Sequence, residues 1–225
     1  MMLKIDVLTL FPKMLDGFVT ESIVGRALRE QLFSLQVRNL RDWAEGPHYQ
    51  VDDRPFGGGA GMVLQFDVLS KAIKSLRKEK THVVYLCPDG MPLTMKKVRE
   101  LTQKEHVVLV SGHYESVDER FREQYVDEEI SIGDYVLTNG TLPAAVVIDA
   151  MVRCLPGALG DEQSLEQDSF RDGLLSFPQY TRPKEHEGKG VPSILFSGDH
   201  AAIAKWRLEQ QIKRTIRRRP DLIFN

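Results

Sequence analysis

The hydrophobic positions of the first 155 residues follow two different periods. Continuous apolar runs rich in β-branched residues are typical of buried parallel strands. They occur at 3–10, 35–40, 82–87 and 106–111, and a weaker strand signal, "VDEEIS", occurs at 126–131. Apolar residues spaced three and four apart predict helices. These lie at 21–33, 66–79, 94–103 and 142–155. Strands separated by helices indicate an α/β fold with a parallel sheet. The last of the helices is apolar almost all round, so we expect it to be buried.

The pattern changes after residue 156. Residues 156–173 are rich in Gly, Ser and acids, a composition typical of linkers. Further on, Leu208, Ile212 and Ile216 recur every four residues, which predicts a helix. The expected organisation is an α/β domain at 1–156, a flexible linker at 157–170 and a small, mainly helical domain at 171–225.

Positive charge is concentrated in this last helix. Residues 205–219 contain seven basic residues and one acid, which gives this segment a net charge of +6. The whole chain has a net charge of −2, so the remainder of the chain has a net charge of −8. A basic helix is usually a solvated face, and the alternative is contact with nucleic-acid phosphates.

Composition excludes several classes of protein. The two cysteines give neither a disulfide framework nor zinc-ligand spacing, and the six histidines show no ligand spacing, so no metal site is predicted. No apolar stretch approaches the roughly 20 residues that span a bilayer, and the N-terminus does not read as a signal peptide. The expectation is a cytoplasmic protein without a membrane partner.

The stretch "VDDRPFGGGAGM" at 51–62 gathers four glycines. It is not a phosphate-binding P-loop, because no lysine and hydroxyl follow the last glycine. A glycine motif that binds a dinucleotide would have to follow a strand directly, and residues 46–55 do not show the pattern of a strand. Two interpretations remain: a mobile loop, or a loop whose backbone approaches a ligand closely.

Three glycine-bearing turns follow strand signals, at 87–90, 111–116 and 132–143. Ligands of open α/β sheets bind beyond the carboxyl ends of the strands, so the three turns together predict one pocket for an adenine or a small polar ligand. The alternative is that each turn simply needs its glycine. In the linker, Asp168 and Ser169 precede Phe170 as a helix N-cap would. A carboxylate beside a ligand pocket can instead be a general base.

Several strings taken together carry a family resemblance. They are "VDDRPFGGGAGM", "SIGDYVLTNGTLP", "DSFRDGLL", "YTRP", "VPSILFSGDH" and "KWRLEQQIKRT". In this order they resemble the bacterial tRNA (guanine-N1)-methyltransferase family over nearly the whole chain.

The resemblance implies a SPOUT-class α/β fold with a deep trefoil knot, S-adenosylmethionine held in the knot loops, and a homodimer whose active site is shared between subunits. It implies methyl transfer to N1 of the guanosine directly 3′ of the tRNA anticodon, position 37. The resemblance also suggests a requirement for Mg²⁺, although no residue pattern in the sequence identifies a binding site for it. The rival hypotheses are a SPOUT methyltransferase with another RNA target and a non-catalytic RNA-binding SPOUT protein.

The resemblance also implies residue roles. Asp168 matches the general base for the N1 proton, and Arg153 matches the residue that stabilises O6. The implied cofactor-binding residues are Leu86, Pro88, Gly90, Gly112, Tyr114, Glu115, Ile132, Gly133, Asp134, Tyr135, Val136, Leu137, Gly140 and Pro143. The implied tRNA contacts are Asp52, Arg54, Gly57, Gly58, Gly59, Ser169, Lys205, Arg207, Lys213, Arg214 and Arg217.

The chain departs from the family pattern at a few positions. "GHYES" stands where the family usually has G-R-Y-E-G, so His113 replaces an arginine and Ser116 a glycine. "NGTLP" stands for G-G-E-L-P, with Asn139 and Thr141 as the changed residues, and Ser176 stands where an acid is common. We expect these changes to affect affinity at the pocket rim.

Overall fold

The computed structural model describes residues 2–161 and 163–224. The chain divides into two compact units, Met1–Gly160 and Asp161–Asn225. This division falls within the predicted linker of 157–170.

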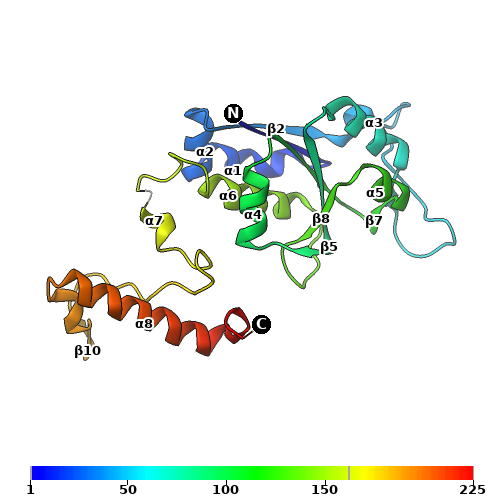
Figure 1. The fold of residues 1–225 in the computed structure, drawn as a ribbon. Helices are drawn as coiled ribbons and strands as arrows, with labels where there is room; N and C mark the ends of the chain where they lie inside the picture. Colours follow the sequence, from blue (N-terminus) through cyan, green and yellow to red (C-terminus); the bar gives the residue numbers. More distant parts are fainter. Residues whose placement is uncertain (1, 162, 225) are drawn as a thin grey trace. The chain divides into compact units, whose positions relative to one another are not determined.

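The first unit is built on a five-stranded sheet in the order β2-β1-β6-β5-β8, and every pair in it is parallel (Figure 1). Its strands are β1 (Leu3–Thr9), β2 (Phe33–Asn39), β5 (Thr81–Pro92), β6 (His106–Ser111) and β8 (Glu128–Ser131). The predicted α/β fold with a parallel sheet is confirmed.

Helices cover both faces of this sheet (Figure 1). Val84 and Leu86 of β5 face one core, while Val83 and Tyr85 face the other, as the two-residue period of a strand requires. The helices of the first face are α1 (Asp16–Thr20), α2 (Ser22–Arg29), α4 (Met95–Thr102) and α6 (Thr141–Arg153). Those of the second face are α3 (Phe66–Leu76) and α5 (Glu119–Tyr125).

Helix α6 is less buried than its composition predicts. Val147 and Ile148 are fully buried against the sheet, but Leu142 is 48% and Val146 46% exposed. The prediction of a wholly buried helix was therefore wrong for this face, because the sheet lies on one side of α6 only.

Strand β5 is longer than the apolar run that predicts it. Its pairing with β8 shifts between Leu86 and Met91, so the intervening residues form a bulge within one strand rather than a turn after it. A Cβ on Gly90 would lie 2.5 Å from the Ile130 backbone nitrogen, so close strand packing requires this glycine.

The glycine-rich loop is anchored by a small second sheet in the order β3-β4-β7. Its strands are β3 (Asp52–Asp53), β4 (Val63–Leu64) and β7 (Ser116–Val117). The expectation that 46–55 holds no strand was therefore wrong at two residues. Two short 3-10 helices complete the unit, η1 (Pro12–Leu15) and η2 (Leu40–Trp43).

The second unit is dominated by one long helix, α8 (His200–Arg218), which confirms the helix predicted in the basic tail. The Asp199 side chain caps it by accepting a hydrogen bond from Ala202 N at 3.0 Å. The other elements are α7 (Gln163–Glu166), the strand pair β9 (Glu185–His186) and β10 (Lys189–Gly190), η3 (Ser193–Phe196) and η4 (Pro220–Leu222). Among the described residues of both units, no helix is long and apolar enough to cross a bilayer.

Candidate functional site

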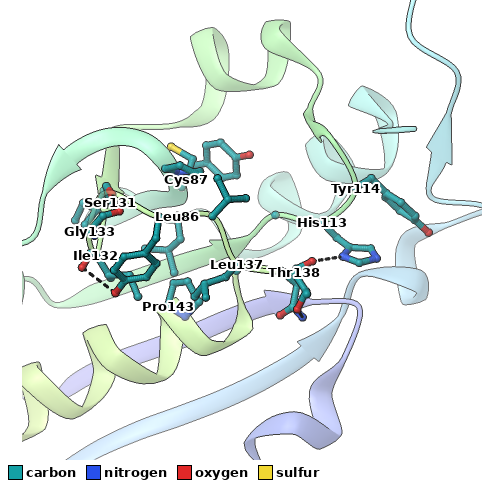
Figure 2. Close-up of a pocket in the computed structure, with 18 residues that line it drawn as sticks. Leu86, Cys87, His113, Tyr114, Ser131, Ile132, Gly133, Leu137, Thr138 and Pro143 are labelled. Carbon is teal, nitrogen blue, oxygen red and sulfur yellow. Dashed lines mark hydrogen bonds between the residues drawn. The ribbon is translucent and has the colours of Figure 1, made fainter. Parts of the chain in front are cut away.

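A cavity lies at the carboxyl ends of β5, β6 and β8, and the loops that follow or interrupt these strands form its walls (Figure 2). The cavity has a volume of about 100 Å³ and opens to solvent at its mouth. The three segments expected to share one pocket, 87–90, 111–116 and 132–143, all contribute to it.

Local hydrogen bonds shape the loop after β8. The Ser131 hydroxyl donates to the Gly133 carbonyl at 3.0 Å and accepts from the Gly133 N–H at 3.2 Å. The Tyr135 hydroxyl donates to the Ile132 carbonyl at 3.3 Å. A side chain at Gly133 would collide with the Tyr135 ring, so glycine allows the loop to fold back on itself.

The same loop then returns to the end of β6. Gly140 N donates to the Gly112 carbonyl at 2.8 Å, and a Cβ on Gly140 would lie 2.8 Å from Gly112 N. Beneath this contact, the buried Thr141 hydroxyl lies 2.8 Å from the Thr9 hydroxyl and 3.1 Å from the Ser111 hydroxyl. Thr141, one of the departures from the family pattern, therefore ties the loop to both β1 and β6.

Eleven of the fourteen implied cofactor residues line the cavity, and the other three do not. Gly90 lies in the bulge between β5 and β8. Glu115 faces the glycine-rich loop, where a Cβ on Gly61 would meet its carboxylate. Asp134 is exposed to solvent. Cofactor contact by all fourteen stays a prediction.

Seven further residues line the cavity without having been predicted to bind the cofactor. They are Tyr85, Cys87, His113, Ile130, Ser131, Thr138 and Asn139. Most lie immediately next to a predicted residue, so a prediction that included one or two more positions on each side would have contained them.

His113 has a defined role at the rim. Its Nδ1 lies 3.1 Å from the Thr138 carbonyl, which can only accept, so Nδ1 carries the proton in this contact. The imidazole also packs edge-on against Phe11, with ring centroids 4.9 Å apart, and in a tilted arrangement against Tyr114, with centroids 4.3 Å apart. The histidine that departs from the family pattern thus joins two of the loops (Figure 2).

An ion-pair cluster lies behind the cavity. Arg122 donates to both Glu129 oxygens, at 2.8 and 2.6 Å, and to Asp89 at 2.7 Å. Asp89, Glu129 and Cys87 also have the spacing of metal ligands. However, the Arg122 guanidinium already supplies the positive charge between these carboxylates. Its hydrogen bonds hold the pKa of the Asp89 carboxyl below its usual range. The cluster is therefore read as structural.

The Cys87 thiol is expected to be almost unreactive. Burial, reinforced by the neighbouring Asp89 carboxylate, raises its pKa to about 12. At pH 8 the reactive thiolate fraction is then about a thousandfold below that of an ordinary cysteine with a pKa of about 8.5. In the Cys154→Ser variant, which leaves one thiol, iodoacetamide should label Cys87 at least about 100-fold more slowly than free cysteine.

The same Cys154→Ser variant unfolded in urea is the control and should react at the rate of free cysteine. Equal labelling rates for the folded and unfolded protein would contradict the raised pKa.

Asp168 lies in a turn of the second unit rather than at the start of a helix. Ser176 N donates to the Ser169 hydroxyl at 2.9 Å, and Phe170 N donates to the Leu174 carbonyl at 2.7 Å. Phe170 itself has a φ of 71°, which no helix start allows. The N-cap interpretation of Asp168 and Ser169 was therefore wrong. Arg153 is half-buried at the end of α6, in the first unit.

The implied tRNA contacts fall into three groups. Gly57, Gly58 and Gly59 are exposed with positive φ, Arg54 beside them is exposed as well, and Asp52 lies half-buried in β3. Ser169 closes the turn just described. Those on α8 are Lys205, Arg207, Lys213, Arg214 and Arg217. Their contact with RNA stays a prediction.

Comparison with known proteins gives a consistent result. The family model described as "tRNA (Guanine-1)-methyltransferase TrmD" matches residues 3–225. A Chlamydia pneumoniae protein named tRNA (guanine-N(1)-)-methyltransferase is 55% identical over 99% of this chain and 62% of its own length. Relatives of the same name from Staphylococcus haemolyticus and Brevibacillus brevis are 52% and 51% identical, over 98% of this chain and 91% of their own length. The chain thus spans less than two thirds of the Chlamydia protein.

Proposed function

Because the chain belongs to the tRNA (guanine-1)-methyltransferase family, we propose that it transfers a methyl group from S-adenosylmethionine to N1 of a guanosine in tRNA. The observation that carries the proposal is the match over residues 3–225 together with the cavity that the three loops form. The finer proposal is that the target is the guanosine directly 3′ of the anticodon.

The lining of the cavity suits an adenosine-containing cofactor. Apolar side chains such as Leu86, Ile132 and Leu137 face it, and glycine-rich backbone supplies polar groups between them (Figure 2). Within the part of the chain described, no Asp, Glu, Lys or Arg is among its lining residues, which suits a flat heterocycle held by stacking and backbone contacts. When bound, S-adenosylmethionine supplies an electrophilic methyl group.

We assign the remaining chemistry to two side chains. Guanine N1 carries a proton and becomes nucleophilic only when that proton leaves, so the reaction needs a base and a group that stabilises charge on O6. We propose that Asp168 takes the N1 proton and that Arg153 stabilises O6. The walls of the cavity contribute by positioning the reacting atoms.

We propose a homodimer on the basis of exposed apolar surface on the first unit. Leu142 and Val146 of α6 are exposed, as are Met91 of the bulge and Val136 of the cavity loop. A second subunit that covered these side chains would remove apolar area from water. Sharing the active site between subunits belongs to the same proposal.

The trefoil knot is likewise a proposal. It is supported by the path of the chain, because β8 lies at the sheet edge beyond β5, yet Gly140 returns to Gly112 at the end of β6. The second unit is the proposed tRNA-binding domain, on the evidence of its basic α8. A role for Mg²⁺ and a cytoplasmic location stay predictions.

Methyl transfer to two tRNA transcripts tests the proposed function. One transcript carries G directly after the anticodon and the other carries A, and each is incubated with labelled S-adenosylmethionine. We expect label in the G transcript only. Label in both transcripts would contradict the proposed position, and label in neither, with the cofactor still bound, would favour a non-catalytic RNA-binding protein.

A further inference from the structure

A second cavity lies within the second unit and has aromatic walls. Its rings come from Phe177 and Tyr180 in the segment before β9, Phe196 of η3 and Trp206 of α8. The Tyr180 and Trp206 ring centroids are 6.5 Å apart with an interplanar angle of 48°. Tyr180 is 47% and Phe196 51% exposed, so both rings remain accessible to a ligand.

The cations of this cavity have no acidic partners. Arg182, Lys184 and Arg207 line it, and among the described residues none of the three forms an ion pair and no acid is a lining residue. Lys184 Nζ lies 4.7 Å from the Phe196 ring centroid, and the Arg207 guanidinium carbon lies 4.6 Å from that of Phe177. Arg207 Nε is buried without a hydrogen-bond partner. An anion that reached this cavity would find three uncompensated positive charges.

The simplest alternative is an imperfectly closed core of a small unit. A core gap would be expected to have apolar walls and buried rings. Part of the lining does fit a core, since Phe177 is buried and Val191, Leu195 and Ile203 are aliphatic. However, Tyr180 and Phe196 are half-exposed and three cations lie among the rings, and a buried guanidinium nitrogen without a partner is unfavourable unless a ligand supplies the missing acceptor. The combination of accessible rings and unpaired cations is that of a nucleotide-binding surface.

We propose that this cavity holds one nucleotide of the tRNA, with its base against Tyr180 and Trp206 and its phosphate near Arg182, Lys184 and Arg207. This inference rests on the proposed function, because that function makes tRNA the partner. Stacking tolerates any base, since every base has a flat π-face. The cavity should therefore contribute affinity for tRNA rather than selection of the methylated guanosine.

The two tryptophans of the chain allow a direct test on the full-length protein. Trp43 lies in the first unit, where its Nε1 donates to the Ser75 hydroxyl at 3.0 Å, so Trp43→Phe leaves Trp206 as the sole tryptophan. We expect tRNA to quench Trp206 fluorescence in this background. Adding Tyr180→Leu should weaken tRNA binding about tenfold, as loss of one stacked base does. The KM for tRNA should rise by the same factor as the affinity falls. The kcat at saturating tRNA and the affinity for the cofactor should stay unchanged.

Two matched variants serve as controls. Tyr180→Phe keeps the ring and should bind tRNA as the parent does. Leu208→Ala removes an exposed apolar residue of the same helix that does not line the cavity, and it should also bind normally. Adenosine monophosphate at the same concentration as the tRNA should leave the fluorescence unchanged.

Three results would overturn the inference: no quenching by tRNA, unchanged tRNA affinity in Tyr180→Leu, or equal quenching by adenosine monophosphate. Fluorescence does not depend on methyl transfer, so the two proposals can fail separately. Normal methylation without quenching would contradict only the proposed nucleotide site. Quenching without methylation of any transcript removes only the proposed activity.

Discussion

Asp168→Ala should lower kcat for methyl transfer by about 10²–10⁴-fold, the contribution that a positioned general base makes. Without the carboxylate, nothing in the proposed scheme accepts the N1 proton, and guanine N1 remains a poor nucleophile. The affinity for S-adenosylmethionine should be unchanged, because Asp168 lies in the second unit and the cavity in the first. Single-turnover transfer of labelled methyl and calorimetric titration of the cofactor measure the two quantities.

Two further variants make this prediction specific. Asp168→Asn preserves the size of the side chain but cannot take the proton, so it should be as defective as the alanine variant. Asp172→Ala removes an exposed acid from the same turn and should be nearly as active as the parent. Transfer at the parent rate by Asp168→Asn would rule out the assigned base while leaving the enzyme intact.

Gly140→Ala should abolish measurable cofactor binding, a loss of at least about 100-fold. The added Cβ would lie 2.8 Å from Gly112 N and 2.9 Å from Ser111 Cα, and both are backbone atoms that cannot rotate away. The loop must then lift off the end of β6, which opens the cavity. Overpacking of this kind also destabilises a fold by about 1–3 kcal/mol. Calorimetry with S-adenosylmethionine and thermal unfolding followed by circular dichroism measure both effects.

A graded series of glycine variants tests the steric cause. A Cβ on Gly112 would meet the side chain of Tyr85 at 3.0 Å, and that side chain can shift, so Gly112→Ala should be less damaging than Gly140→Ala. Gly17 lies in α1 with no atom within 4 Å of the added Cβ, so Gly17→Ala should bind the cofactor normally. Equal cofactor affinity in all three variants would show that close approach of the two loops does not shape the site.

The hydrophobic pattern was sufficient for the sheet but not for its details. The apolar runs at 82–87 and 106–111 predict β5 and β6 because central parallel strands are buried on both faces. The pattern could not show that β5 continues to Pro92, since the bulge interrupts its apolar run. Helix α5 was not predicted, because Phe121 is its one buried residue and no apolar period marks it; Asp118 caps the helix by accepting from Arg120 N.

The candidate site was predictable as a set of loops but not as a set of contacts. Strand ends indicate where a pocket forms, so the turns that contain Gly112 and Ile132 were found from their position, whereas Leu86 was implied only by the family resemblance. The N-cap interpretation of Asp168 was wrong because only its local sequence resembles a cap. In the structure a turn closes there instead, since Ser176 N donates to the Ser169 hydroxyl and Phe170 N donates to the Leu174 carbonyl. The exposure of Leu142 could not be read from a helix that is apolar on nearly every side, because composition does not show which side the sheet covers.

The bond between Thr9 and Thr141 has a consequence for biosynthesis. The two hydroxyls are 132 residues apart in the chain, so at a translation rate of about 5–20 residues per second Thr9 is made about 7–26 s before its partner. Until then the nascent chain can form neither this bond nor the contact between Gly140 and Gly112. The cofactor cavity is therefore completed only after nearly the whole first unit has left the ribosome, and a chain truncated before α6 would have all five strands of the main sheet but no closed site.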